Sequence, residues 1–143
     1  MDLPRSIPIA LSSLDDRPLC GTTPAREVII TSTSGGGPSH YFWVIFLNAQ
    51  NGYTGHHLVS TGSLSASIVH PREVLGPALR EGAAHVILAH NHPSGEPTPS
   101  KEDIQLTRQL AEGARLLGIR LHDHLIIGNG TGDWVSLAQR GVL

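Results

Sequence analysis

The spacing of apolar residues along the chain predicts strands and helices in alternation. Residues 41–47 are apolar throughout and rich in aromatic side chains, as expected of a central strand that is buried on both faces. Asn51-Gly52 is a hairpin signal, so residues 53–61 would form the returning strand. The β-branched run at 27–32 predicts a further strand closer to the N-terminus.

Helical patterns appear between strand patterns in the second half of the chain. Pro71 suits the first position of a helix that runs towards Gly82, and Pro77 inside this helix should kink or delay it. Residues 84–89 are apolar apart from His85, which predicts a buried strand. The apolar positions of 100–117 recur with a helical period and predict the most regular helix of the chain.

The closing part of the chain predicts one more strand. Gly118 ends the preceding helix, residues 119–127 predict a strand, 128–132 a turn and 134–143 a short closing element. Strands that alternate with helices favour the α/β class. We therefore expect three layers, in which helices flank a mixed β-sheet.

Composition and charge narrow the class of protein. Residues 1–24 are rich in Pro, Ser and Asp and lack periodicity, so we expect an extended N-terminal segment followed by one domain over 25–143. The net charge of −2 and the scattered arginines make direct nucleic-acid binding an unfavoured interpretation. The sequence contains no apolar run long enough for a membrane span, and Cys20, as the single cysteine, excludes an intramolecular disulfide. We expect a cytoplasmic protein with no membrane partner.

Two histidines follow the strand pattern at 84–89 directly. His90 and His92 are separated by one residue, so both can point to the same side of a strand. Asp103 comes one short loop later, at the opening of the predicted helix. Two imidazoles and a carboxylate suit zinc and leave a fourth position for water. The pair alone has an equally good alternative, which is a polar strand end.

Ser100 and Asp103 also fit a structural interpretation. Ser-x-x-Asp before an apolar helix resembles a capping box, in which the serine oxygen accepts a backbone N–H of the first turn. The acidic residue there would also suit the positive end of the helix dipole. The two interpretations are compatible, because a pinned first turn would hold Asp103 in a fixed place, as a metal ligand requires.

The full string resembles a known motif. His90-x-His92, the proline-rich loop 93–99 and Ser100-x-x-Asp103 together resemble the JAMM (MPN-type) metalloprotease motif, and the surrounding residues resemble the bacterial RadC family. The likeness extends from about Pro24 to the C-terminus. Three segments carry it: VHPREV at 69–74, AHVILAHNHPSG at 84–95 continued by PTPS at 97–100, and HDHLIIG at 122–128.

The resemblance implies an MPN fold, related in layout to the cytidine deaminases, with one zinc ion. It implies that His90, His92 and Asp103 are the zinc ligands and that Ser100 hydrogen-bonds a water or the oxyanion near the metal. The implied activity is hydrolysis of a peptide or isopeptide bond, so the expected partner is a peptide or protein substrate. The oligomeric state stays open, and a homodimer is one of the states considered.

The chain departs from the JAMM pattern at one position. Such enzymes use a glutamate as general base, and this glutamate lies on the strand before the first helix. Counting back from Gly62 in this sequence, the corresponding position falls on His57. The segment 41–68 contains no acidic residue. His57 could act as the base, since imidazole titrates near neutrality, or as a fourth ligand. Alternatively, Glu73 or Glu96 could reach the water. We expect His57 to face the metal.

The other histidines give weaker signals. His122 and His124 repeat the i, i+2 spacing around Asp123, which predicts either a second site or a supporting role near the cleft. We favour a different interpretation of these residues, in which the strand simply carries polar groups that are hydrogen-bonded within the fold. His56 should face away from His57 on the same strand. The remaining histidines show no partner pattern and are interpreted as structural or surface residues: His40, His70 and His85.

Two further functions follow from the same features. The absence of the glutamate favours, as an alternative, a catalytically impaired MPN module that binds partners and retains the metal. The RadC resemblance brings an association with DNA repair, although the helix-hairpin-helix region of longer relatives is not in this sequence. A zinc nucleobase deaminase is disfavoured, because a single cysteine cannot supply its Cys-x-x-Cys ligands.

Overall fold

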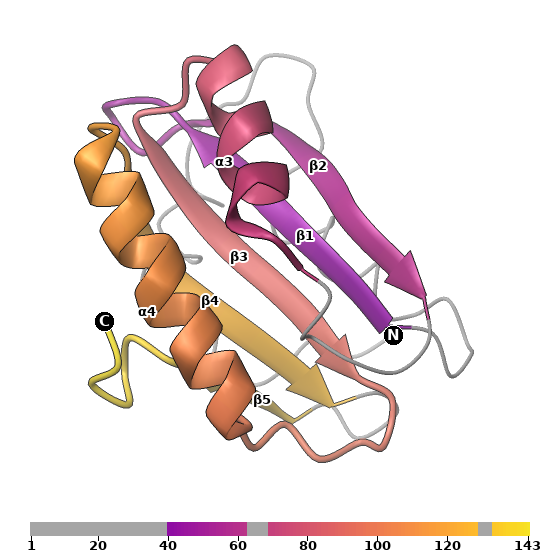
Figure 1. Ribbon diagram of the computed structural model, residues 1–143. Helices are drawn as coiled ribbons and strands as arrows, with labels where there is room; N and C mark the ends of the chain where they lie inside the picture. The colour runs from indigo at the N-terminus through magenta and orange to yellow at the C-terminus, as the bar shows by residue number, and fades with distance from the viewer. Residues whose placement is uncertain (1–39, 63–68, 129–132) are drawn as a thin grey trace.

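The computed structural model describes residues 40–62, 69–128 and 133–143, and these residues form one mixed sheet with two helices (Figure 1). The sheet order is β2-β1-β3-β4-β5, and only the β3–β4 pair is parallel. The strands are β1 (His40–Leu47), β2 (Tyr53–Gly62), β3 (His85–His92), β4 (Arg120–Gly128) and β5 (Trp134–Ser136), and the helices are α3 (Pro71–Arg80) and α4 (Lys101–Leu116).

The expected α/β class and the mixed sheet with helices packed on it are confirmed. The two described helices form one layer rather than the expected two, because both pack on the same apolar face. Asn51 has a positive φ of 62° in the β1–β2 turn, as a tight hairpin requires. Helix α3 begins at Pro71 and continues through Pro77, so this second proline does not delay the helix. Strand β3 extends beyond the predicted end at residue 89 and includes both histidines. The expected N-terminal segment 1–24 and the strand at 27–32 lie outside the described residues.

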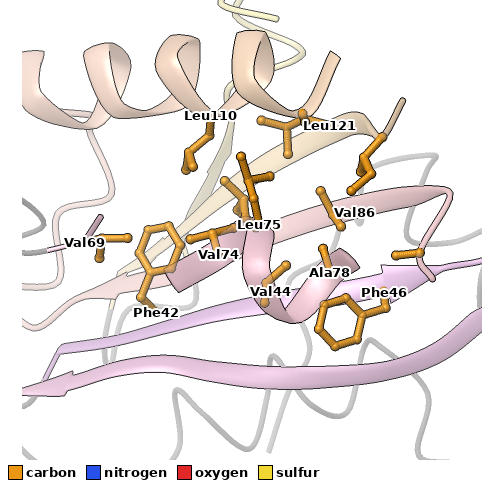
Figure 2. Packing of buried hydrophobic residues seen from close by; sticks show 14 of the residues in the cluster. Phe42, Val44, Phe46, Val69, Val74, Leu75, Ala78, Val86, Leu110 and Leu121 are labelled. Atoms are coloured by element: carbon orange, nitrogen blue, oxygen red, sulfur yellow. The ribbon is translucent and has the colours of Figure 1, made fainter. Parts of the chain in front are cut away.

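Both described helices cover the same face of the sheet (Figure 1). Figure 2 shows how their apolar side chains meet those of the central strands on this face. The cluster includes Phe42, Val44 and Phe46 of β1, Val74, Leu75 and Ala78 of α3, and Leu106, Leu110 and Ala114 of α4. Alternate residues of the same strands, such as Ile45 and Ile87, are fully buried on the opposite face. The central strands are therefore buried on both faces, as predicted from their continuous apolar runs.

Helix α4 has strong signals at both ends. Ser100 is the N-cap, its Oγ accepts the N–H of Asp103, and the Asp103 side chain accepts the N–H of Ser100, so the predicted capping box is confirmed. At the other end Gly118 has a φ of 75°, which is the left-handed conformation that ends many helices. No helix in the described part of the chain is long and apolar enough to cross a membrane.

Replacing Gly118 by alanine should lower the free energy of unfolding by about 1 kcal/mol, because an L-residue with a side chain is strained in the left-handed region. A Cβ at this position would meet no atom within 4 Å, so the cost is conformational rather than steric. Gly118→Asn is the matched control and should lose less, since asparagine tolerates this conformation. Urea denaturation measures the difference, and equal stability of the two variants would contradict the assignment.

Candidate metal centre

Three side chains converge at the carboxyl end of β3. The Nε2 atoms of His90 and His92 lie 3.2 Å apart. Asp103 Oδ2 is 3.2 Å from His92 Nε2, and Asp103 Oδ1 is 3.4 Å from His90 Nε2. The ligand atoms that these residues offer all lie within 4.8 Å of one another, so the predicted cluster can hold a metal ion. It assembles because β3 ends beside the first turn of α4, and only a short loop separates them.

The polar atoms of the cluster suit a cation. His90 and Asp103 are 4% and 1% exposed, so little water reaches them. Asp103 Oδ1 is buried and makes no hydrogen bond among the described residues. A buried carboxylate oxygen without a donor is costly, and two imidazole nitrogens that face it add further lone pairs. A positive ion between the three groups would satisfy all of them.

The electrostatics favour an ionised carboxylate. Burial raises the pKa of Asp103, but the contacts with His90 and His92 outweigh burial and hold it well below its usual range. The hydrogen bond with Asp103 raises the pKa of His92, against the effect of its partial burial. The site therefore carries a negative charge that stabilises positive charge close to the imidazoles.

His92 is held by the loop that follows it. Its Nδ1 lies 2.8 Å from the carbonyl oxygen of Glu96, and a carbonyl can only accept, so Nδ1 carries the proton. The neutral ring then presents the lone pair of Nε2 to the cluster. A histidine ligand whose other nitrogen donates to a backbone carbonyl is a common arrangement in metal sites. The carboxylate of Glu96 accepts instead from Thr98.

Ser100 lies beside the cluster at the start of α4. Its Oγ accepts the N–H of Asp103 at 3.1 Å, and its backbone N–H donates to Asp103 Oδ2 at 2.9 Å. The first bond uses a lone pair of the hydroxyl and leaves the O–H group as a donor. The backbone bond fixes the carboxylate, so the capping box also orients a candidate metal ligand.

His122 and His124 do not share a face of β4. The register with β3 shifts at this point, because Val86 pairs with Leu121 and Ile87 with Asp123, which makes His122 the extra residue of a bulge. His124 therefore turns towards the site, and its Nε2 lies 2.7 Å from His90 Nδ1. Burial lowers the pKa of His124 well below its usual value.

The two residues that precede His124, His122 and Asp123, contact other parts of the fold. His122 Nε2 lies 2.9 Å from the side-chain oxygen of Asn51, and its ring packs against that of His85. Asp123 accepts hydrogen bonds from Ser136 Oγ and from the backbone N–H of Ala138, which ties β4 to β5. The His122–His124 pair therefore does not form a second metal cluster among the described residues, and the contacts agree with the favoured interpretation, a strand with hydrogen-bonded polar groups.

His57 lies on the same face of the sheet as the cluster. It pairs with Val44, which pairs in turn with Leu88 two residues before His90. Strand spacings of about 4.8 Å and a rise of about 3.3 Å per residue place the Cα atoms of His57 and His90 roughly 12 Å apart. The side chain of His57 is exposed. The neighbouring His56 is exposed on the opposite face, where its ring packs against Tyr53.

Sequence reasoning missed one polar residue of the site. Thr107 is fully buried on α4, and its Oγ1 contacts both the carbonyl oxygen of Asp103 and Nδ1 of His124. A threonine within an amphipathic helix gives no signal by itself. Its position four residues after Asp103 does place it on the same helix face, which is the one available hint. Glu73, considered above as an alternative acid, lies in the first turn of α3.

Comparison with known proteins agrees with this geometry. A UPF0758 protein of Pelobacter propionicus is 53% identical over 103 residues, which cover 72% of this chain and 44% of that protein. A UPF0758 protein of Symbiobacterium thermophilum is 52% identical over 102 residues, 71% of this chain and 43% of the relative. The chain thus spans less than half the length of these relatives. The family model described as the RadC-like JAB domain matches residues 24–142. The chain therefore belongs to the RadC-like JAB domain family.

Proposed function

We propose that the chain is a zinc-dependent hydrolase of the JAMM type that cleaves a peptide or isopeptide bond. The observation that carries the proposal is the spacing of the three candidate ligands. Ligands at the zinc distances of about 2.0–2.1 Å in a tetrahedron lie about 3.3–3.4 Å from one another. The two imidazole Nε2 atoms lie 3.2 Å apart, and the carboxylate of Asp103 approaches His90 at 3.4 Å through Oδ1 and His92 at 3.2 Å through Oδ2. One ligand atom from each residue lies within 4.8 Å of the others, a spacing that a single metal ion can bridge. Three protein ligands would leave the fourth position for water or substrate.

Each residue of the site has a task in this proposal. Zinc would supply an activated water at neutral pH and a polarised carbonyl. Asp103 and the two imidazoles bind the metal, and the ionised carboxylate offsets its charge. The O–H group of Ser100 donates to the oxygen on which negative charge develops, since accepting the N–H of Asp103 does not use this hydrogen.

His57 is the proposed proton acceptor. By the count back from Gly62 it corresponds to the position at which JAMM enzymes have glutamate, and the strand register supports its lying on the same sheet face as His90. A neutral imidazole can accept a proton from the attacking water and deliver it to the leaving amine. The side chain of His57 is exposed, and the strand geometry gives roughly 12 Å between the Cα atoms of His57 and His90, a separation that the two side chains and a bound water together would have to span.

Hydrolysis by the zinc-loaded chain, assayed on a peptide and isopeptide library, tests the proposal. The wild type should be active, His90→Ala inactive, and His57→Ala slower in kcat by about 100-fold or more, the usual contribution of a general base. His56→Ala is the matched control, because His56 precedes His57 but faces the other side of the sheet. It should keep full activity. Wild-type activity that survives His90→Ala would refute a metal-dependent mechanism.

The histidine at position 57 of β2, in place of a glutamate, also favours a second function, that of a binding module. With no acidic residue in 41–68, the chain would keep the metal and bind peptide segments without cleaving them. In that case the wild type should be inactive in the assay, and His57→Glu should create activity by restoring the acid. Activity in the wild type that His57→Glu does not increase would favour the hydrolase.

A further inference from the structure

We infer that Thr107 and His124 form a hydrogen-bonded relay that fixes the tautomer of His90. The relay keeps the proton of His90 on Nδ1 and leaves a lone pair on Nε2, the nitrogen that faces the metal position. The two residues would thus be positioning residues, neither of which contacts the metal. The inference rests on the proposed metal site for its functional consequence. The relay itself rests on three contacts among buried groups of α4, β4 and β3.

The direction of the relay is set at Thr107. Its Oγ1 lies 2.6 Å from the carbonyl oxygen of Asp103, and a carbonyl can only accept. The single hydroxyl hydrogen of Thr107 therefore lies in this bond. The same Oγ1 is 2.6 Å from His124 Nδ1, so at this contact the hydroxyl must accept and the ring must donate. His124 consequently carries a proton on Nδ1.

The contact between His124 and His90 then determines which nitrogen of His90 carries the proton. A neutral His124 with its proton on Nδ1 has a lone pair on Nε2. This Nε2 lies 2.7 Å from His90 Nδ1, so His90 Nδ1 donates the proton between them. The lone pair of His90 is then on Nε2, the atom that lies 3.2 Å from His92 Nε2. If His124 Nε2 instead donated to His90 Nδ1, the proton of a neutral His90 would lie on Nε2 and would block a metal there.

Packing holds the relay in place. Thr107 and His124 are fully buried and His90 is 4% exposed, so water is a poor substitute for any of the three. The ring of Phe42 stacks on His90 and meets His124 edge-on, at centroid distances of 5.5 and 5.4 Å. This leaves the two imidazoles little freedom to flip.

The relay also connects two ligands of the proposed metal. It starts at the backbone carbonyl of Asp103 on α4, passes through β4 and ends on His90 of β3. Asp103 and His90 thus keep a fixed separation even though they belong to different elements. Hydrogen-bond partners of metal ligands commonly contribute about 10- to 100-fold to metal affinity.

Two pairs of matched variants of the whole chain test the relay. Thr107→Val keeps the shape of the side chain but removes the hydroxyl, whereas Thr107→Ser keeps the hydroxyl. His124→Leu removes the acceptor for His90, whereas the side-chain carbonyl of His124→Gln can replace it. We expect zinc affinity, measured by chelator competition, to fall about 10- to 100-fold in Thr107→Val and His124→Leu. Thr107→Ser and His124→Gln should recover most of the loss.

Nitrogen-15 NMR of the imidazoles provides a readout that does not depend on metal. His124 should carry its proton on Nδ1 in the metal-free and in the zinc-loaded protein, and Thr107→Val should disturb this tautomer. Finding the proton on Nε2 of His124 in the wild type would overturn the relay, even if zinc binds. Wild-type zinc affinity in His124→Leu would also overturn it and leave the metal site intact. Failure of the wild type to bind zinc would instead contradict the proposed metal site, and the tautomer would still decide the relay.

Discussion

Replacing His90 by alanine is expected to leave the purified protein without stoichiometric zinc. Loss of a hydrogen-bond partner of a ligand alone costs about 10- to 100-fold in affinity, so loss of the ligand itself should cost at least about 100-fold. Metal analysis of the purified protein and chelator competition measure the effect. Zinc content equal to that of the wild type would show that the cluster is not the metal site.

The control for this variant is His85→Ala, because His85 lies on the same strand and outside the cluster. It should retain zinc. Since His90 is buried and stacks on Phe42, alanine would also leave a cavity. His90→Gln keeps most of the volume, and circular dichroism of the metal-free proteins separates loss of fold from loss of a ligand. Both His90 variants should lose zinc, and only the alanine variant should be clearly less stable.

The candidate ligands could be predicted from the sequence because their positions depend on local rules. Strand alternation places His90 and His92 on one face, and a capping box fixes Asp103 in the first turn of α4. The apolar runs and helical periods likewise predicted the central strands and both helices. Each of these inferences needs only a few consecutive residues.

The partners of the ligands could not be predicted in the same way. Alternation along β4 would put His122 and His124 on one face, but the bulge opposite Val86 and Ile87 separates them. The bulge depends on the register between two strands that are joined by a helix. Thr107 becomes part of the site only once α4 packs over β4, so its role follows from tertiary structure. The sequence contains the residues of the relay but gives no indication of their contact.

The same limit applies to His57. Counting along the motif places it on the strand before α3, and pairing through Val44 confirms that it lies on β2, on the sheet face of the cluster. Whether this imidazole accepts a proton, binds the metal or does neither depends on how its exposed side chain turns. That orientation is not a property of the local sequence, which is why the variants at this position carry the test of catalysis.

Asp103→Asn is expected to abolish zinc binding while the fold remains. Asparagine has nearly the shape of aspartate, and its carbonyl oxygen can still accept the N–H of Ser100, so the cap of α4 is preserved. The variant lacks the negative charge that offsets a divalent cation next to two neutral imidazoles. Zinc affinity should therefore fall by at least about 100-fold, more than for loss of a hydrogen-bond partner alone. Chelator competition measures it, and circular dichroism checks that helix content is unchanged.

Ser100→Ala is the complementary variant and should show the opposite pattern. It removes the hydroxyl that caps α4 and should lower the free energy of unfolding by about 1 kcal/mol, measured by urea denaturation without metal. The backbone N–H of residue 100 still donates to Asp103, so the ligands stay in place and zinc affinity should change little. If Ser100 also stabilises the oxyanion, kcat of the zinc-loaded variant should fall by about 100- to 1,000-fold. Unchanged kcat in an active enzyme would restrict Ser100 to its capping role, and equal loss of zinc in both variants would contradict the separation of the two roles.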